Sequence, residues 1–235
     1  MHRRLLLWDV DGTLVRAGDL GAAVFDAAFE HVVGRRPARR IQMSGKTDPQ
    51  IVREYLSLMD VEEMEGTVDT VGAVLGVMEC HLAAAAADLA ASGSACPGAE
   101  EVLRRLAGDA RVLSSVLTGN TASNAVVKLA AFGLDRWLDL EVGAYGSDES
   151  DRNLLVPVAL KRVADLRGER LSPEDVWVIG DTPRDLACAQ AGGARCLLLA
   201  TGRYRVEELV SLGADVVVDD LADADAVVKV LTGDL

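Results

Sequence analysis

The sequence predicts an α/β fold, in which a parallel sheet with helices on both faces carries a smaller helical domain. Two observations predict the sheet: short apolar runs alternate with segments of helical periodicity, and only 4% of the residues are aromatic while alanine, leucine and valine abound. Strands buried on both faces have this continuous apolar pattern, and helices usually join parallel strands. A third observation predicts the added domain, because a long helical stretch without strands separates the first two apolar runs.

The elements of the predicted sheet alternate along the chain. We expect strands at residues 5–8, 112–117, 138–142, 176–179, 196–199 and 216–218. We expect helices near residues 98–107, 122–131, 153–166, 183–191, 204–212 and 221–231. Strands that alternate with helices in this way are typical of a parallel sheet.

The added domain is expected to be wholly helical. Apolar residues recur at helical spacing near residues 24–32, 51–56 and 71–89. The sequences Ser92-Gly93-Ser94 and Pro97-Gly98 are typical of a linker followed by a helix start. We therefore expect an α/β core formed by residues 1–16 and 93–235, with residues 17–92 inserted as a helical cap.

The charge of the chain limits its partners. The formal net charge is −13 at pH 7. A nucleic-acid partner requires a basic face that neutralises phosphates, so we expect none. A small anionic substrate remains compatible with this charge, because a few donors aimed at one site dominate the field there.

The N-terminus and the cysteines indicate the compartment. Two arginines precede an apolar run, but Asp9 ends that run too early for a signal peptide or a membrane span. The four cysteines form no CxxC pair, and Cys188 and Cys196 lie in apolar stretches, as buried free thiols do. We expect a soluble, cytoplasmic protein without a membrane partner; the oligomeric state is left open.

The first polar motif is Asp9-Val10-Asp11-Gly12-Thr13, directly after the first predicted strand. In parallel α/β sheets, ligands bind at the carboxyl ends of the strands. Two residues apart, Asp9 and Asp11 project to one side as the strand ends, and Gly12 lets the chain turn away. A simple Asp-Gly turn explains Gly12, but it does not require two aspartates after a hydrophobic strand.

The second motif, Thr118-Gly119-Asn120-Thr121, follows the predicted strand at 112–117. A hydroxyl, a glycine amide and a helix N-terminus near Thr121 together form a potential anion pocket. Alone this pattern is weak, because Thr and Asn are common helix caps.

The third cluster, Gly180-Asp181-Thr182-Pro183-Arg184-Asp185, follows the predicted strand at 176–179. Thr182 as the N-cap and Pro183 at the first helical position account for a helix start. They do not account for Asp181, which is an acidic residue at the end of another strand. Because parallel strands end at one edge of a sheet, we expect the three clusters to converge on one site.

With these motifs, the chain resembles the haloacid dehalogenase superfamily of phosphohydrolases over nearly its whole length. The superfamily's first motif is DxDGT (here Asp9 to Thr13), its second is a Thr or Ser after the next strand (Thr118), and its fourth is GDxxxD (Gly180 to Asp185). A helical cap between the first two motifs is similar to that of phosphoglycolate phosphatases. The resemblance implies a Rossmann-like core and phosphatase activity without naming the substrate.

The third motif departs from the superfamily pattern. It is usually a lysine at the start of the helix before GDxxxD, and the candidates here are Arg152 and Lys161. Arg152 precedes the predicted helix and can point at the active-site edge, whereas Lys161 lies in mid-helix, where a solvated lysine is expected. We expect Arg152 to fill the role, with a bidentate donor in place of a point charge.

The resemblance implies a Mg²⁺-dependent hydrolysis in two steps. Asp9 would attack phosphorus and form an aspartyl-phosphate, while Asp11 would protonate the leaving group and then activate water. The metal would be held by Asp9, the main-chain carbonyl of Asp11 and Asp181. The phosphoryl group would be bound by Thr118, Gly119, Asn120 and Arg152. The carboxylates would be supported by Thr13, Thr182 and Asp185.

The cap contributes Ser44-Gly45-Lys46-Thr47-Asp48-Pro49. Its Gly-Lys-Thr does not end a Walker A loop, because Arg40 stands where that loop needs a glycine. We expect a helix start with Asp48 as the cap and Pro49 in the first turn. In relatives a similar segment leans over the active site, so Lys46 and Thr47 are expected to contact the far end of the substrate.

Other activities remain as alternatives. A phosphomutase would use the same aspartates but favour a sugar over water as the acceptor, and the cap decides between the two. A phosphonate hydrolase would need a reactive cap lysine, for which Lys46 is the candidate, and a dehalogenase would not need Asp11 or the metal site. A non-catalytic phospho-ligand-binding protein would be expected to have lost Asp9, Asp11 or Asp181, yet all three are present.

Overall fold

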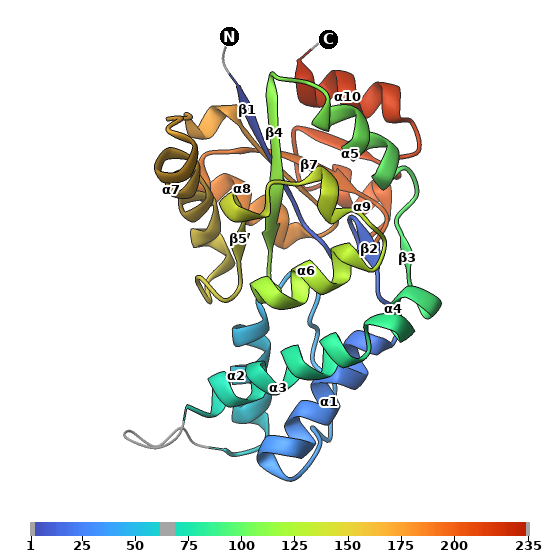
Figure 1. Cartoon of the computed structure of the whole chain (residues 1–235), viewed down its shortest axis with the longest axis vertical. Coiled ribbons are helices and arrows are strands. Elements are labelled where there is room, and N and C mark those ends of the chain that lie inside the picture. Colours follow the sequence, from blue (N-terminus) through green and yellow to red (C-terminus); the bar gives the residue numbers. More distant parts are fainter. Residues whose placement is uncertain (1–2, 62–68, 234–235) are drawn as a thin grey trace.

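The computed structural model describes residues 3–61 and 69–233. Its core is a six-stranded sheet in the order β5-β4-β1-β6-β7-β8, in which every neighbouring pair is parallel (Figure 1). The strands are β1 (Arg4–Trp8), β4 (Val112–Thr118), β5 (Ala144–Tyr145), β6 (Val176–Gly180), β7 (Arg195–Leu199) and β8 (Val216–Val218). The prediction of an α/β fold with a parallel sheet is confirmed.

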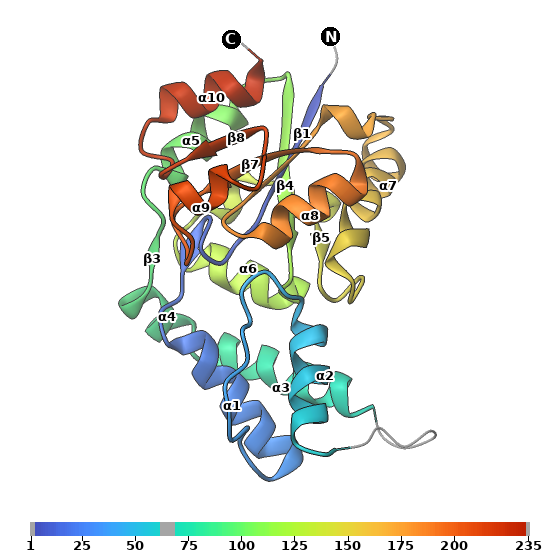
Figure 2. The same ribbon diagram turned by 180° about the vertical axis from the view of Figure 1, so that it is seen from behind.

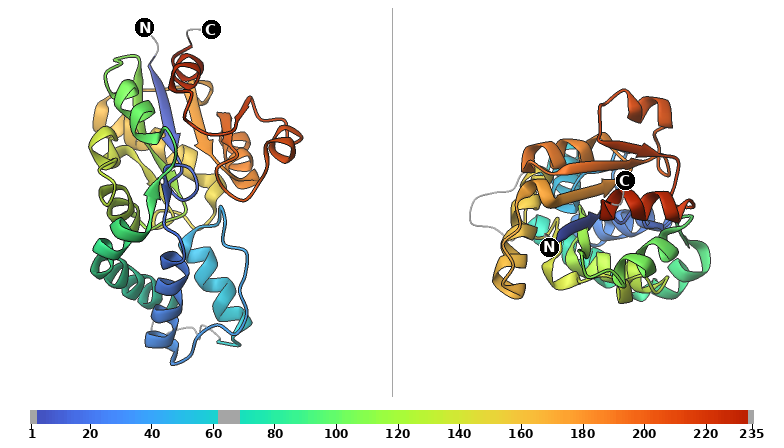
Figure 3. Two further views of the ribbon diagram at one scale, coloured as in Figure 1. Left: turned by 90° about the vertical axis from the view of Figure 1, so that its right-hand side faces the viewer. Right: turned by 90° about the horizontal axis from the view of Figure 1, so that it is seen from above.

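Helices cover both faces of this sheet (Figure 3). On one face, Leu6 and Trp8 of β1 pack with α5 (Ala99–Ala107), α6 (Ala122–Ala130) and α10 (Ala224–Thr232). On the other face, Leu5 and Leu7 pack with α7 (Leu155–Arg167), α8 (Pro183–Gly192) and α9 (Val206–Val210). Successive side chains of β1 thus enter opposite layers, which explains why its sequence is continuously apolar.

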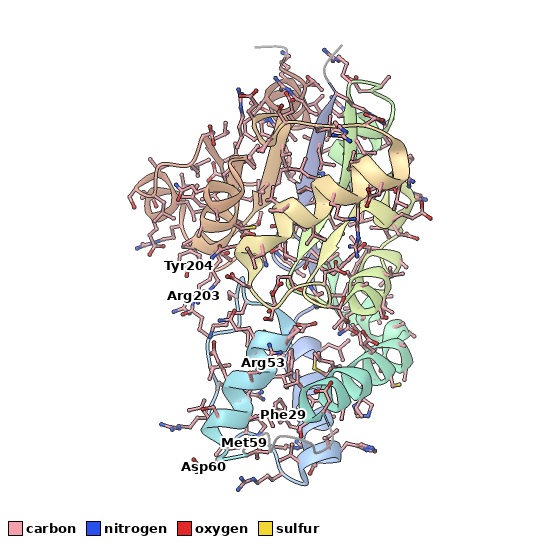
Figure 4. All side chains as sticks on the ribbon, turned by 90° about the vertical axis from the view of Figure 1, so that its left-hand side faces the viewer. Phe29, Arg53, Met59, Asp60, Arg203 and Tyr204 are labelled. Carbon is pink, nitrogen blue, oxygen red and sulfur yellow. The ribbon has the colours of Figure 1, made fainter. Side chains whose placement is uncertain are left out.

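In the described ranges, four further helices form a lobe that faces the carboxyl ends of the strands (Figures 1 and 2). They are α1 (Leu20–Val33), α2 (Asp48–Leu58), α3 (Thr70–Ala84) and α4 (Ala86–Ser92). The lobe has its own apolar cluster, in which the rings of Phe29 and Tyr55 meet edge to face with their centroids 5.4 Å apart. Figure 4 shows Phe29 among the helices of the lobe.

The two crossings between core and lobe run side by side. The outgoing strand β2 (Val15–Arg16) pairs antiparallel with the returning strand β3 (Ser94–Ala95), and the amide of Cys96 extends this contact by donating to the carbonyl of Leu14 (2.9 Å). On this basis we propose the division into a core of residues 1–16 and 93–235 and a cap of residues 17–92.

The strand expected at residues 138–142 is wrong. Residues 140–142 form the short 3₁₀ turn η2 (Leu140–Val142), residues 138 and 139 join it to the preceding turn η1 (Asp135–Trp137), and the outer strand β5 follows. Asp139 contacts β4 only locally: its amide donates to Ser114 (2.8 Å), and its carbonyl accepts from the Ser115 hydroxyl (2.6 Å). Its carboxylate forms an ion pair with Arg167 of α7. The segment is therefore fixed through the contacts of one residue and not through the ladder of hydrogen bonds that a strand would form.

The apolar stretch near residues 71–89 is divided between α3 and α4. The two helices meet at Ala85 with a bend of 63°. In the part of the chain that the structure describes, no single helix is long and apolar enough to cross a membrane. The bent pair α3–α4 would meet that test by length and composition alone. Val74, Met78 and Leu89 of this pair are buried in the lobe's own apolar cluster.

Candidate active site

The chain turns sharply where β1 ends. The amide of Asp9 donates to the carbonyl of Ile179 on β6 (2.8 Å), so the sheet itself holds Asp9 in place. Gly12 has φ = 85°, in the left-handed region that favours glycine. A Cβ atom at this position would lie 2.6 Å from Oδ2 of Asp181. Gly12 therefore turns the chain and leaves room for a second aspartate.

Three buried aspartates meet at the ends of β1 and β6. Carboxylate oxygens of Asp9, Asp181 and Asp185 lie within 4.8 Å of one another. Oδ2 of Asp185 accepts hydrogen bonds from the amide (2.9 Å) and hydroxyl (2.7 Å) of Thr182, and its Oδ1 accepts from Arg152. Thr182 thus supports Asp185 and also begins α8 as its N-cap, followed by Pro183.

Asp181 has an oxygen that the protein does not satisfy. Its Oδ1 is buried and has no hydrogen-bond partner among the described residues. A buried carboxylate oxygen without a partner is costly, and a bound cation would satisfy it. A site that offers only oxygen ligands suits Mg²⁺. The residues present therefore fit a divalent cation beside Asp9 and Asp181.

Burial raises the pKa of both proposed metal-binding carboxylates. Burial, and after it the neighbouring charges of Asp185 and Asp9, raise the pKa of Asp181 to about 8. Burial also raises the pKa of Asp9 to about 6, although the Arg152 guanidinium opposes this shift. The ionised forms of these two groups therefore gain from a cation placed between them.

These shifts lead to an expected pH dependence of stability. A carboxyl group whose pKa is raised by folding binds more protons in the folded state, so its stabilising contribution is present at low pH and is lost as the pH rises through the folded pKa. The stabilising contribution is lost as the pH rises through about 6 for Asp9 and through about 8 for Asp181. The free energy of unfolding of the metal-free protein should therefore fall across this range.

Denaturation in EDTA and in Mg²⁺, repeated across that pH range, measures the effect. Mg²⁺ should largely remove the decrease in the free energy of unfolding, because it stabilises the ionised carboxylates. In EDTA, Asp181→Asn should make this decrease smaller. An equal fall in EDTA and in Mg²⁺ would count against a cation at this cluster.

The segment after β4 is linked by a hydrogen bond to Asp11. Thr118 is the last residue of β4 and is fully buried. Its hydroxyl accepts from the side-chain amide of Asn120 (2.8 Å), and that same amide donates to Oδ2 of Asp11 (2.7 Å). Thr121 caps α6 by accepting from the amide of Asn124. Thr118, Asn120 and Asp11 are thereby linked in one hydrogen-bonded group.

Arg152 contacts the carboxylate of Asp9. It lies in a short turn just before α7, and only 5% of its surface is exposed. Its Nη2 lies 3.2 Å from Oδ1 of Asp9 and forms an ion pair with Asp185. Burial disfavours its charge, but the carboxylates of Asp185 and Asp9 outweigh burial and raise its pKa. The alternative, Lys161, is exposed on α7 and pairs with Asp165.

The segment from Ser44 to Asp48 docks onto the core. The amide of Asp48 donates to the carbonyl of Gly119 (2.7 Å), and its buried carboxylate accepts from the amide of Thr121 (3.0 Å). Burial raises the pKa of Asp48 to about 6, and the charge of Lys128 opposes this shift. A Cβ atom on Gly119 would lie 2.0 Å from the carbonyl oxygen of Lys46, so only glycine admits this close approach.

Three predicted site residues differ in their contacts from what the sequence suggests. Thr47, not Asp48, is the N-cap of α2, because Asp48 uses its carboxylate on the core; the Thr47 hydroxyl also donates to the carbonyl of Ser150 (2.7 Å). Lys46 lines the cavity but forms an ion pair with Glu54. The hydroxyl of Thr13 is buried without a hydrogen-bond partner among the described residues.

Lys128 is a site residue that the motifs do not reveal. It lies on α6, is 8% exposed, and its ammonium contacts both Asp11 (2.6 Å) and Asn120 (2.7 Å). The available signal is periodicity: Ala125, Lys128 and Leu129 share the buried face of α6, where a lysine is out of place unless it has partners.

A cavity of about 390 Å³ lies between core and lobe. From the core, Asp9, Asp11 and Arg152 line it, and from the lobe Phe25 and Lys46. Arg203, after β7, also lines it and has no ion pair or hydrogen bond among the described residues. Figure 4 shows Arg203 and Tyr204 where the core faces the lobe, and the Tyr204 hydroxyl accepts a hydrogen bond from Gln42 (3.2 Å).

Comparison with known sequences gives consistent matches. A family model described as haloacid dehalogenase-like hydrolase matches residues 6–190. Phosphoglycolate phosphatase 1 of Pseudomonas aeruginosa is 29% identical over 231 residues, which cover 94% of this chain and 78% of that protein. Phosphoglycolate phosphatase of Rhodospirillum rubrum is 27% identical over 221 residues, which cover 93% of this chain and 88% of that protein.

Solved structures share the fold. A hydrolase from Pseudomonas syringae superimposes with a TM-score of 0.69 at 19% identity, covering 95% of this chain and 97% of that one. CbbY from Rhodobacter sphaeroides, in complex with phosphate, gives a TM-score of 0.69 at 18% identity, covering 94% and 96%. At this level of identity, these structures show a shared fold and nothing about shared function.

Proposed function

The chain belongs to the haloacid dehalogenase-like hydrolase family, and from this premise we propose that it is a Mg²⁺-dependent phosphatase of small phosphate monoesters. The observation that carries the proposal is the buried carboxylate of Asp9 at a strand end, set between the Arg152 guanidinium and the unsatisfied oxygen of Asp181. The two relatives named as phosphoglycolate phosphatases support a phosphate ester as the substrate.

In the proposed first step, an oxygen of Asp9 attacks phosphorus. The new O–P bond forms as the bond to the leaving group breaks, and the electron pair of that bond stays on the leaving oxygen. Asp11, two residues further on and partly exposed in the cavity, gives that oxygen a proton. In the second step Asp11 takes a proton from the water that hydrolyses the aspartyl-phosphate.

The remaining residues would hold the phosphoryl group and the carboxylates. Arg152, the hydroxyl of Thr118 and the main chain at Gly119 and Asn120 surround the end of β4 beside Asp9 and offer donors to the phosphoryl oxygens. Mg²⁺, held by Asp9, Asp181 and the carbonyl of Asp11, would neutralise charge on the phosphoryl oxygens when bound. Asp185 and Thr182 support this group through Arg152 and the start of α8.

Lys46 remains our proposed contact at the far end of the substrate. Thr47, the other residue expected there, is fully buried and does not line the cavity, so we propose that it supports this segment as the N-cap of α2. A second anionic group on the substrate would have to compete with Glu54 for Lys46. Arg203 also lines the cavity and has no such competitor among the described residues, so it offers a second cation to the substrate.

A screen of phosphate monoesters tests the proposed function. We expect phosphate release that depends on Mg²⁺, stops when EDTA is added and returns when Mg²⁺ is restored. Release that continues at the same rate in EDTA would contradict the metal, and failure to hydrolyse any ester would favour a binding protein. Including a sugar acceptor in the assay separates a phosphomutase, because the mutase would transfer the phosphoryl group to that sugar.

A further inference from the structure

Lys128 is buried in the site but has no role in the chemistry described so far. It projects from α6, three residues after Ala125 on the helix face that packs against the sheet. Only 10% of its side chain is exposed. Burying a lysine is costly unless its charge is paired, so its partners identify what it does.

Its ammonium contacts two side chains of the site, those of Asp11 and Asn120. Nζ lies 2.6 Å from Oδ2 of Asp11 and 2.7 Å from the side-chain oxygen of Asn120. Asn120 in turn donates from its side-chain amide to Oδ2 of Asp11 and to the hydroxyl of Thr118. Lys128 and Asn120 therefore hold the same oxygen of Asp11.

The other oxygen of Asp11 is left available. No hydrogen bond from a described residue reaches Oδ1, and 45% of the Asp11 side chain is exposed, within the lining of the cavity. A carboxylate held through one oxygen has a defined orientation, and its second oxygen is then directed away from the two donors.

Arg152 is also a buried cation of the site, but it does not hold the Asp11 carboxylate. Arg152 contacts Asp9 and Asp185 and donates to the carbonyl of Gly45 (3.4 Å), and it forms no hydrogen bond or ion pair with Asp11. In the second proposed step Asp11 is ionised beside the phosphorylated Asp9, and an ammonium in contact with Asp11 offsets the repulsion between these two groups.

We propose that Lys128 is a positioning residue, which holds the Asp11 carboxylate through Oδ2 so that Oδ1 meets the leaving-group oxygen. The proposal rests on the proposed phosphatase function. In the step concerned, the proton leaves Oδ1 of Asp11 for the leaving oxygen as the P–O bond breaks. Lys128 itself neither gives nor takes a proton.

The test uses the dependence of the rate on the leaving group. An alkyl ester needs a proton on its leaving oxygen, whereas 4-nitrophenol leaves well without one. In Lys128→Met, kcat/KM for an alkyl phosphate should fall about 10²- to 10³-fold, while kcat/KM for 4-nitrophenyl phosphate should fall less than about tenfold. In an Asp11→Asn background, Lys128→Met should cause no further selective loss for the alkyl ester.

Lys161→Met is the matched control, because the same substitution then falls on an exposed lysine of α7. If Lys128→Met does not fold, Lys128→Gln keeps a donor without the charge and is measured in the same way. An equal loss for both esters would overturn the proposal, since Lys128 would then act on the phosphoryl group or on the fold. If the wild-type protein hydrolyses neither ester, the proposed function itself fails, and that result is distinct.

Discussion

Asp9→Asn is expected to lower phosphate release by at least about 10⁴-fold, because an amide cannot form the covalent intermediate. The fold should tolerate the change well. Asparagine has the same shape, and the substitution removes one of three mutually repelling charges from a buried cluster. Near pH 8 the variant should therefore be at least as stable as the wild type, because the ionised Asp9 carboxylate is disfavoured by burial.

Steady-state hydrolysis and thermal denaturation of the same preparations measure the two effects. Asp165→Asn is the matched control, because Asp165 is exposed and pairs only with Lys161 among the described residues. The control should retain wild-type activity. Wild-type activity in Asp9→Asn would refute the mechanism, whatever the result for stability.

Arg152→Leu is expected to destabilise the fold strongly as well as to inactivate it. Removing Arg152 leaves Asp9 and Asp185 buried, close together and without their shared cation. Breaking a buried ion pair by deleting one partner typically costs about 3–5 kcal/mol of the free energy of unfolding. Activity should fall too, because a donor to the phosphoryl group is lost.

Denaturant titration separates this effect from the loss of an ordinary ion pair. Arg136→Leu makes the same substitution in an exposed pair with Glu100 and should change the free energy of unfolding little. Adding Asp185→Asn to Arg152→Leu should recover part of the stability, because one uncompensated charge is removed. If Arg152→Leu were as stable as Arg136→Leu, the buried cluster would not depend on Arg152.

The sequence predicts those parts of the site that follow strands directly. Asp9, Thr118 and Asp181 come at the ends of short apolar runs, and parallel pairing brings such ends to one edge whatever the rest of the chain does. The placement of Arg152 follows from the same logic, since it precedes a helix that returns to the sheet. The fold class was predictable for the same reason.

What the sequence does not predict depends on packing between distant segments. The partners of Lys128 come from the segments that follow β1 and β4, and Asp48 accepts from the start of α6. No local pattern shows which lysine on an amphipathic helix turns inward. The prediction of a strand at 138–142 is wrong for the same reason. This segment is held against β4 by the main chain of Asp139, which bonds to Ser114 and Ser115, and a local apolar pattern does not show such contacts.

The place of β1 in the sheet has a consequence for biosynthesis. The strand is made first, yet it lies between β4 and β6, so that Leu7 pairs with Ser115 and with Val178. Until both partners have left the ribosome, β1 is an apolar segment with an open edge. The acidic cluster also lacks Asp181 and Asp185 until then. A chain interrupted before Asp185 therefore has neither a complete sheet nor a complete acidic cluster, so the proposed site forms only after β6 and the start of α8 have been made.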